Sequence, residues 1–463
     1  MGKLFGTDGI RGKANTYPMT AEVALRVGRA LTHLCRLESR AKGRPGRRPR
    51  ILIGKDTRRS CYMLENALTA GICSMGGDAL LLGPMPTPGI AFLITSMRAK
   101  AGVVISASHN PFEDNGIKIF GREGTKLPDE KERMLEDLVL GRELDEMTPL
   151  AGEDVGSAKR IDDARGRYIV FCKNTFRDDL TLTGLKLVLD CANGATYRVA
   201  PEVFWELGAD VETMGSAPNG LNINEECGAL DPSRLARRVV EARAFAGLAF
   251  DGDGDRLIVV DEKGDVLNGD QVLAICAKEM KARGTLRNDT LVATVMSNVG
   301  LTLACKEMGV TLIRTKVGDR FVLEEMLALD ATLGGEASGH MIFRNCHTTG
   351  DGIIAALQLL SVATSQEKPL GELAKIITMF PQKLVNVVVR ERPDIMSVPE
   401  IASAITEAEA ELGEQGRVLV RYSGTELLCR VMAEGPTQEQ TDGIVARIAA
   451  AVQKTIGITQ TPA

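Results

Sequence analysis

The stretch AGVVISASHNP, residues 101–111, decides the fold class of this 463-residue chain. Residues 101–107 form an apolar run rich in β-branched side chains, which is typical of a buried strand. The pair Asn110-Pro111 then favours a turn, because the residue before a proline is restricted to extended conformations. A strand followed by a polar loop is the repeating unit of α/β folds, and their ligands gather at the carboxyl ends of the strands.

Further runs of the same kind lie elsewhere in the chain. They predict buried strands at 51–54, 185–190, 246–251 and 291–296, which end in Gly- or Asp-rich loops. Helical patterns lie between these runs. Such alternation favours an α/β protein in which helices cover both faces of parallel sheets.

One helix is predicted at 21–37, and Thr20 can cap its N-terminus. The basic stretch 38–50, broken by glycine and proline, follows it. A solvated surface loop is favoured there over an anion or nucleic-acid patch. The helix has five apolar residues on one face: Val23, Val27, Ala30, Leu31 and Leu34.

Length and composition predict several globular domains. A chain of 463 residues is too long for one core, and 44% hydrophobic with 25% charged residues is ordinary globular composition. Boundaries are indicated by the charged stretch 152–167, by the end of the LIVVDE strand near 260, and near 375–385. We therefore expect four domains, at 1–160, 161–260, 261–378 and 379–463.

Bulk properties also argue against several classes of protein. A net charge of −5 argues against an extensive nucleic-acid-binding surface. The ten cysteines show no C-x-x-C pair, which favours reduced, buried thiols. No signal-peptide core opens the sequence, and no apolar run reaches the roughly 18 residues that span a membrane. A cytoplasmic protein without membrane or nucleic-acid partners is the expectation.

Ser108 is the first candidate functional residue. The turn at Asn110-Pro111 would present it at the mouth of the sheet, as a nucleophile or as a hydroxyl that stabilises the turn. Spacing alone favours the turn. Neither G-x-S-x-G nor a P-loop occurs, which argues against an α/β-hydrolase and a Walker-type NTPase.

The segment Asp251-Gly-Asp253-Gly-Asp255-Arg256 is the second candidate. Three carboxylates at alternate positions repel one another unless a cation lies between them, and the glycines let the backbone curl. Oxygen ligands favour Mg²⁺ or Ca²⁺. An EF-hand would place Glu262 at its twelfth position, but Arg256 replaces the required glycine. Metal binding is favoured over a solvated acidic turn.

Two further loops carry polar groups. In GGEASGH, residues 334–340, Glu336 and Ser338 could bind sugar hydroxyls and His340 could approach a phosphate or a proton, although a polar loop without a role fits equally. In RYSGTE, residues 421–426, followed by Arg430, guanidinium, hydroxyl and backbone N–H groups fit the oxygens of a phosphate.

These loops combine into one chemistry. A metal would neutralise the oxygens of a phosphoryl group, Ser108 would carry that group, and the distant cradle would hold a second phosphate. This set of parts suits the movement of phosphate between two hydroxyls of one sugar.

The sequence also resembles the α-D-phosphohexomutase superfamily along nearly the whole chain. ISASHNP, DGDGDR, GGEASGH and RYSGTE correspond in order to its serine, metal, sugar and phosphate loops. FGTDGIRG (5–12), LGPMPTP (82–88) and GLNINEECG (220–228) are similar to the bacterial branch that acts on glucosamine phosphates.

The resemblance implies an α/β protein of four domains around a central cleft. Three would be related α/β domains with mixed or parallel sheets, and the C-terminal one a smaller α+β domain. It implies interconversion of glucosamine 6-phosphate and glucosamine 1-phosphate through phosphorylated Ser108. Glucosamine 1,6-bisphosphate would be the intermediate and activator, one Mg²⁺ per subunit the cofactor, and UDP-N-acetylglucosamine synthesis the destination. A homodimer is weakly implied.

The resemblance also assigns residues. The implied metal ligands are Ser108, Asp251, Asp253 and Asp255. The implied catalytic residues are Ser108, Lys118, Arg11, His340, His109 and Arg256. The implied substrate-binding residues are Lys316, Arg320, Glu336, Ser338, Arg421, Ser423, Gly424, Thr425 and Arg430.

The sequence leaves other functions open. A phosphomannomutase or phosphoglucomutase would share all four loops. A non-catalytic, metal-dependent phosphosugar sensor would keep the fold, and a Mg²⁺-dependent phosphatase would release free phosphate as its main product. Two positions depart from the family pattern: Leu427 replaces a usual proline, and Ala337 replaces a commonly larger residue.

Overall fold

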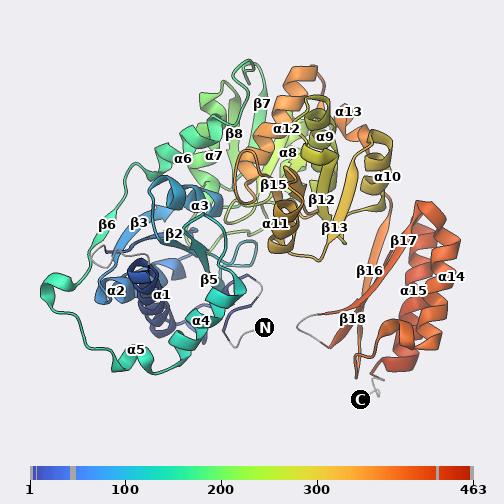
Figure 1. Cartoon of the computed structure of the whole chain (residues 1–463). Helices are drawn as coiled ribbons and strands as arrows, with labels where there is room; N and C mark the ends of the chain where they lie inside the picture. Colours follow the sequence, from blue (N-terminus) through green and yellow to red (C-terminus); the bar gives the residue numbers. More distant parts are fainter. Residues whose placement is uncertain (1–3, 7, 42–47, 424–426, 459–463) are drawn as a thin grey trace. The chain divides into compact units, whose positions relative to one another are not determined.

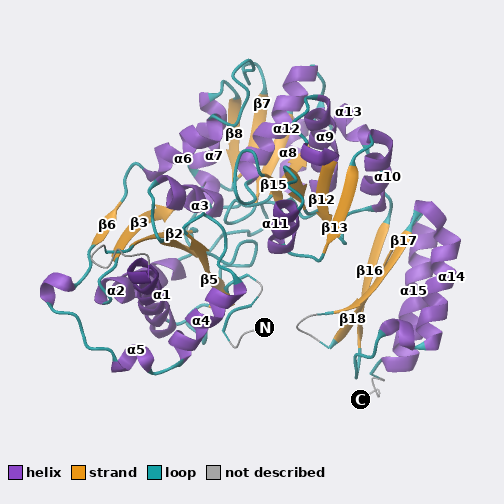
Figure 2. Cartoon of the chain, viewed as in Figure 1, coloured by secondary structure: helices purple, strands orange, loops and turns teal. Residues whose placement is uncertain are grey.

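The computed structural model describes residues 4–6, 8–41, 48–423 and 427–458. The chain forms two compact units. One comprises Met1–Val295 and Thr311–Lys375, and the other comprises Met296–Val310 and Ile376–Ala463. Figure 1 traces the chain through both units, and Figure 2 shows that sheets flanked by helices build the first one.

The first sheet has the strand order β1-β5-β4-β2-β3-β6. Its β2 is parallel to β3 and β4, whereas β5 is antiparallel to β4 and β1. The strands are β1 (Ile10–Lys13), β2 (Arg50–Lys55), β3 (Asp78–Pro84), β4 (Ala101–Ile105), β5 (Asp114–Gly121) and β6 (Ala158–Arg160). The main helices are α1 (Ala21–Ala41), α2 (Ser60–Ser74), α3 (Thr87–Ser96) and α4 (Asp129–Leu140), followed by the short α5 (Glu143–Glu146).

Helices α1 and α2 pack closely because each has a glycine at the crossing. A Cβ atom on Gly28 would lie 2.5 Å from the Leu68 carbonyl oxygen, and one on Gly71 would lie 2.1 Å from the Leu25 oxygen. Larger side chains would push the helices apart and open the core between them and the sheet.

The second sheet has the order β11-β10-β9-β7-β8. Its β7 is parallel to β8 and β9, and β10 is antiparallel to β9 and β11. The strands are β7 (Lys186–Asp190), β8 (Asp210–Met214), β9 (Ala246–Phe250), β10 (Leu257–Val260) and β11 (Val266–Leu267). The helices are α6 (Ala164–Lys173), α7 (Val199–Glu206) and α8 (Ser233–Ala242).

The third sheet has the order β13-β12-β14-β15, with only β15 antiparallel to its neighbour. Its strands are β12 (Thr290–Thr294), β13 (Thr311–Thr315), β14 (Leu333–Gly335) and β15 (Met341–Phe343). Its helices are α9 (Gly269–Ala282), which a capping box of Asn268 and Gln271 starts, α11 (Asp319–Ala328), α12 (Gly352–Gln366) and the short α13 (Leu370–Leu373).

The three sheets repeat one four-strand core. The orders β5-β4-β2-β3, β10-β9-β7-β8 and β15-β14-β12-β13 correspond strand by strand. In each core the strand before the hairpin (β4, β9 or β14) is parallel to its inner neighbour and antiparallel to the strand that follows it. The loops that carry residues 106–113, 251–256 and 336–340 occupy the same place in each repeat.

The second unit contains an antiparallel sheet of order β16-β18-β17. Its strands are β16 (Gln382–Val388), β17 (Arg417–Tyr422) and β18 (Leu428–Glu434), and α14 (Pro399–Leu412) and α15 (Gln438–Ile456) share their core. Helix α10 (Val299–Met308) belongs to this unit, where the buried Glu434 carboxylate accepts the Val299 N–H at 2.7 Å.

The predicted fold class is confirmed: three α/β domains are followed by a smaller α+β domain. All five predicted strands are present as β2, β4, β7, β9 and β12. The predicted helix is α1, which continues to Ala41, and Thr20 Oγ1 accepts the Val23 N–H at 3.4 Å. The sheets are mixed rather than purely parallel, because each core ends in an antiparallel hairpin.

The cysteines agree with the expectation from composition. Eight of the ten cysteines are buried, as expected for thiols that pack as small hydrophobic groups. Among the described residues, no helix combines the length and the apolar character that crossing a membrane requires.

Candidate active site

Ser108 lies in the loop between β4 and β5 and is 3% exposed. Its φ of 52° is unusual for a residue other than glycine, so the surrounding structure must hold it there. Its hydroxyl donates a hydrogen bond of 2.6 Å to Asp251 Oδ2, and its N–H donates to Ser106 Oγ at 2.9 Å. The hydroxyl is therefore aimed at the carboxylate loop of the next domain.

The three carboxylates of the loop between β9 and β10 converge. Asp251, Asp253 and Asp255 are 1%, 1% and 7% exposed, and each offers an oxygen within 4.8 Å of the others. The interpretation as a solvated turn is therefore wrong. An EF-hand is also excluded, because Arg256 leads into β10 and the Glu262 carboxylate accepts the Gly371 N–H at 3.1 Å.

The carboxylate cluster fits a hard divalent cation. Asp253 Oδ1 and Asp255 Oδ1 are buried without a hydrogen-bond partner. Burial, with the neighbouring charges of Asp255 and Asp253, raises the pKa of Asp251 well above its usual range. A cation among these oxygens would satisfy the orphaned lone pairs and remove the repulsion.

Lys118 on β5 brings positive charge to the same place. Its Nζ lies 2.9 Å from Asp253 Oδ2 and 3.4 Å from Asp8 Oδ2. Burial opposes the charge, but Asp253 and Asp8 outweigh it and raise the pKa of Lys118. Arg11 on β1 pairs with Asp8, so both cations share one acidic partner.

His109 and Arg256 line the same region. His109 Nδ1 lies 3.5 Å from Ser108 Oγ. Burial, followed by the charges of Arg256 and Arg11, lowers the pKa of His109 and favours its neutral form. The backbone N–H of Arg256 donates to Asp251 Oδ1 at 3.2 Å and so helps to orient that carboxylate.

The loop between β14 and β15 brings one of its predicted residues, His340, close to the carboxylates. His340 is 3% exposed, and its Nδ1 lies 3.6 Å from Asp255 Oδ2. Burial favours the neutral ring, but Asp255 outweighs it and raises the pKa of His340. Glu336 is buried and accepts the Gly318 N–H at 3.0 Å, whereas Ser338 is exposed.

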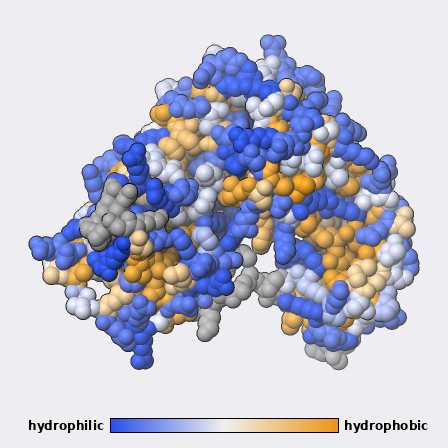
Figure 3. Space-filling model, viewed as in Figure 1, coloured by the Kyte–Doolittle hydropathy of each residue, from blue (hydrophilic) through white to orange (hydrophobic). Residues whose placement is uncertain are grey.

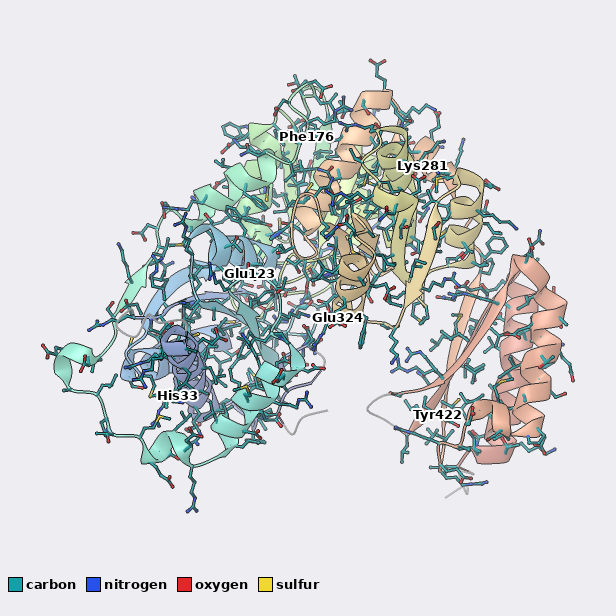
Figure 4. The ribbon with its side chains drawn as sticks, in the orientation of Figure 1. His33, Glu123, Phe176, Lys281, Glu324 and Tyr422 are labelled. Atoms are coloured by element: carbon teal, nitrogen blue, oxygen red, sulfur yellow. The ribbon has the colours of Figure 1, made fainter. Side chains whose placement is uncertain are left out.

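Lys316 and Arg320 flank the start of α11. Lys316 is exposed, with its Nζ 6.0 Å from the centre of the Phe321 ring. Arg320 donates to Glu324 at 2.8 Å on the same helix, where Figure 4 labels Glu324, and it also pairs with Asp129. Figure 3 shows apolar surface where α11 lies, and Phe321 and Leu327 are among its exposed residues.

Sequence reasoning missed a lysine that joins these parts. Lys126 Nζ pairs with Asp8 Oδ1 and lies 2.6 Å from Asp319 Oδ2, at the N-terminus of α11. Burial opposes ionisation of Asp8, but Lys118 and Lys126 outweigh it and hold its pKa well below the usual range. Asp8 lies in the motif at 5–12, whereas no local pattern marks Lys126.

The predicted phosphate loop belongs to the second unit. Arg421 on β17 lies directly opposite Arg430 on β18, and Arg430 Nε is buried without a hydrogen-bond partner. Burial and the charge of Arg430 lower the pKa of Arg421. Two facing cations are typical of an anion site. Ser423 is buried beside them, and Gly424 and Thr425 lie outside the described residues.

Comparison with known proteins gives matches along the chain. Models of phosphoglucomutase/phosphomannomutase match as alpha/beta/alpha domain I at residues 2–145, domain II at 167–264, domain III at 268–380 and C-terminal domain at 384–451. The phosphoglucosamine mutase of Syntrophus aciditrophicus is 58% identical over 457 residues, or 99% of this chain and 100% of that protein. The phosphoglucosamine mutase of Syntrophobacter fumaroxidans is 57% identical over 458 residues, with the same coverage.

A solved structure is similar in fold. The phosphoglucomutase/phosphomannomutase family protein from Burkholderia thailandensis has a TM-score of 0.77 at 24% identity, with 97% of each chain covered.

Proposed function

Because the chain belongs to the phosphoglucomutase/phosphomannomutase family, and within it to the phosphoglucosamine mutases, we propose that it interconverts glucosamine 6-phosphate and glucosamine 1-phosphate. The observation that carries this proposal is the position of Ser108. Its hydroxyl lies 2.6 Å from Asp251, at a buried cluster of three carboxylates that fits a divalent cation.

In this proposal Ser108 carries the phosphoryl group. The bond from phosphorus to Ser108 Oγ breaks while a bond to a sugar hydroxyl oxygen forms, and the hydroxyl proton passes to a nearby base. The product is glucosamine 1,6-bisphosphate. This bisphosphate reorients within the site, so that its other phosphoryl group faces Ser108. That group is then returned to Ser108 by the reverse step. Such transfer depends mainly on positioning and charge stabilisation.

The carboxylate loop and its neighbours would supply the charge. Asp251, Asp253 and Asp255, with an oxygen of the phosphoserine, would hold one Mg²⁺ per subunit. Bound Mg²⁺ offsets the negative charge of the phosphoryl oxygens. Lys118 and Arg11 would add positive charge of their own, and His109 and His340 are the candidates for holding or delivering the proton.

The remaining residues would hold the sugar and its second phosphate. Glu336 and Ser338 would bind hydroxyl groups of the hexosamine, with Lys316 and Arg320 near them in the same domain. The facing pair Arg421 and Arg430 would bind the phosphate that is not being transferred. The same loop would contribute Ser423, Gly424 and Thr425.

We also propose the setting of this reaction. The enzyme would work in the cytoplasm on a small hexosamine phosphate, without nucleic-acid or membrane partners, and as a homodimer. We further propose that the four domains end at residues 160, 260, 378 and 463. Glucosamine 1-phosphate would feed the synthesis of UDP-N-acetylglucosamine.

The decisive experiment combines a turnover assay with intact-mass analysis and peptide mapping. We expect phosphate on Ser108, and turnover of glucosamine 6-phosphate that Ser108→Ala abolishes. The matched control is Ser74→Ala, because Ser74 on α2 only donates to the Gly71 carbonyl at 2.9 Å.

Each rival predicts a different outcome. A preference for mannose or glucose phosphates by more than about tenfold, roughly 1.4 kcal/mol of discrimination, would overturn the substrate assignment. Free phosphate as the main product would indicate a phosphatase. Substrate binding without turnover, with cellular function unchanged in Ser108→Ala, would indicate a sensor.

A further inference from the structure

The segment Gly220–Gly228 has no role in the chemistry described so far. It lies between β8 and α8 in the second α/β domain, and within it Asn224 has a φ of 59°. The Asn224 side chain makes its hydrogen bonds with the serine loop of the first domain. Its Nδ2 donates to the Ser108 carbonyl at 2.9 Å and to the Asn110 carbonyl at 3.0 Å.

Arg58 holds the same two carbonyls from within the first domain. Its side chain is fully buried, and Nη2 donates to the Ser108 oxygen at 3.2 Å and to the Asn110 oxygen at 2.5 Å. Asp56 pairs with the other arm of the guanidinium, so the buried charge is compensated. The carbonyls of Ser108 and Asn110 therefore each accept hydrogen bonds from two side chains, Arg58 of the first domain and Asn224 of the second.

The backbone N–H of Ser108 is also linked to Asp56, through the Ser106 hydroxyl. Ser106 Oγ accepts the Ser108 N–H at 2.9 Å and itself donates to Asp56 Oδ2 at 2.5 Å. Both backbone polar groups of Ser108 are thus tied to buried side chains. The carboxylate loop also packs against this backbone, since a Cβ atom on Gly252 would lie 2.5 Å from the Ser108 oxygen.

These contacts explain how Ser108 keeps its conformation. A left-handed backbone costs a residue other than glycine roughly 1–2 kcal/mol, and persists only where the surroundings determine it. With the N–H and the carbonyl of Ser108 both held, the backbone on each side of its Cα is fixed, and the direction of the Cα–Cβ bond follows from it. If the carbonyl contacts were lost, the loop could relax out of the left-handed conformation, and the hydroxyl would no longer be kept 2.6 Å from Asp251 Oδ2.

We propose that Asn224 and Arg58 are positioning residues for Ser108, which clamp its carbonyl from two domains and so keep its hydroxyl against Asp251. The inference rests on the proposed role of Ser108 as the phosphoryl carrier. It assigns the segment Gly220–Gly228 to the serine loop rather than to the recognition of the sugar. Asn224 acts through Ser108 and touches neither the sugar nor the phosphoryl group.

The test removes the amide and keeps the backbone. Glycine adopts a positive φ without strain, so Asn224→Gly deletes the two hydrogen bonds without straining the backbone, and a matched Asn→Gly control accounts for the added freedom of the unfolded chain. Asn288→Gly is the matched control, because Asn288 also has a positive φ (55°) and donates to a carbonyl, that of Leu329 at 2.9 Å, but is exposed in the third α/β domain.

The primary readout is the rate at which isotopically labelled phosphate leaves Ser108 for glucosamine 6-phosphate in a single turnover. We expect Asn224→Gly to lower this rate by about tenfold or more, the cost of about 1.4 kcal/mol of lost positioning. KM for the sugar phosphate should stay within about twofold, since binding groups are untouched. Asn288→Gly should transfer at the wild-type rate with a comparable change in melting temperature.

A double-mutant cycle adds an independent test. Arg58→Lys keeps the charge beside Asp56 but removes the second arm of the guanidinium. Because Arg58 and Asn224 hold the same carbonyls, their effects on the transfer rate should be non-additive. Additive effects would contradict the shared clamp. If Arg58→Lys fails to fold, Asn224→Gly alone decides.

The outcomes separate this inference from the proposed function. An active wild type together with wild-type transfer in Asn224→Gly overturns the clamp alone. A loss of rate in Asn224→Gly that Asn288→Gly matches also overturns it. A wild type without phosphate on Ser108 and without turnover overturns the proposed function, and the clamp with it.

Discussion

At the residue scale, the site contains buried carboxylates, and a buried carboxylate stays ionised only where positive charge or hydrogen bonds compensate it. Asp253 is 1% exposed, yet burial is outweighed by Lys118 and by the Thr87 hydroxyl, and its pKa falls below the usual range. For Asp251, burial and the charges of Asp255 and Asp253 outweigh Arg256 and the Ser108 hydroxyl, so its pKa is raised. Ionisation is thus favoured at Asp253 and disfavoured at Asp251. A bound cation would stabilise the ionised form of both carboxylates.

We expect Asp253→Asn to weaken metal binding and to lower turnover by orders of magnitude, because the amide keeps the shape but removes the charge. Calorimetric titration with Mg²⁺ would measure the first effect, and the mutase assay the second. Asp231→Asn is the control, since the Asp231 carboxylate accepts hydrogen bonds from Ser233 in an exposed turn and is not one of the three clustered carboxylates. Unchanged Mg²⁺ affinity would mean that the carboxylate loop has been misassigned.

At the element scale, Lys126 ties the N-terminal segment to α11. It bridges Asp8 and Asp319, and burial of its own charge is outweighed by these two acids, which raise its pKa. One lysine therefore compensates two partly buried carboxylates, 26% and 23% exposed, from distant parts of the chain. Removal of a buried partner usually costs about 3–5 kcal/mol, because the remaining charges stay desolvated.

Because these side chains are only partly buried, we expect Lys126→Met to destabilise the protein by about 1–3 kcal/mol in urea unfolding. Asp319→Asn in the same chain should recover part of that loss, because one of the two uncompensated charges disappears. Lys131→Met is the control, since the Lys131–Glu38 pair is about half exposed. If the double variant is no more stable than Lys126→Met, the bridge does not have this energetic role.

The strand pair β17 and β18 allows a second test at this scale. Arg421 and Arg430 face each other, so without an anion their charges repel. Arg421→Gln should leave the melting temperature unchanged or slightly raised in the absence of phosphate. It should raise KM for the sugar phosphate by about tenfold, through loss of a charge-assisted contact.

Calorimetry with and without inorganic phosphate, alongside steady-state kinetics, would measure both effects. Arg447→Gln is the control, because Arg447 pairs with Glu411 on exposed helix surfaces of the same unit. A lower melting temperature without phosphate and an unchanged KM would contradict the proposed cradle.

At the scale of the whole molecule, the three related sheets of the first unit share one arrangement. The loops after β4, β9 and β14 each join a strand to its antiparallel partner, and they supply Ser108, the carboxylates and His340. His347, on the segment after β15, holds the third domain to the first: its Nδ1 accepts the Thr348 N–H at 2.8 Å, so its Nε2–H donates to the Pro88 carbonyl at 2.8 Å.

Burial lowers the pKa of His347 to about 4, against an ordinary value near 6.5. The unfolded chain therefore binds a proton more readily than the folded one between these values. The stability that the neutral ring contributes is complete above about pH 6.5 and is lost progressively as the pH falls toward 4. The largest possible loss is about 3 kcal/mol.

His347→Gln should consequently be less stable than the wild type at pH 7.5, because the Pro88 contact is lost. The difference should shrink as the pH falls toward 4, since only the wild type pays the cost of protonation. Melting temperatures across this range would measure it. His33→Gln on the partly exposed α1 face is the comparison, because burial also lowers the pKa of His33 but leaves its ring partly exposed, so its pH effect should be smaller. A difference that stays constant with pH would contradict the assignment.

Much of the candidate site was predictable from local sequence. Ser108 and the three carboxylates lie in short motifs directly after apolar strands, and both features are local. Lys126 and Arg58 were not predictable in the same way. Lysine and arginine are usually exposed, and only the packing of distant elements makes the partly buried Lys126 a partner of Asp8 and the fully buried Arg58 a partner of the serine loop.

Ser108 separates what the local sequence determined from what the tertiary structure decided. Its sequence neighbours determined a strand, a turn and a hydroxyl at the carboxyl end of that strand, because backbone preferences act over a few residues. They left open whether the hydroxyl only stabilised the turn. Tertiary structure decided that it faces Asp251, 143 positions away, with Asn224 and Arg58 on its carbonyl. Contacts across such separations depend on how whole domains pack, and no local pattern contains that information.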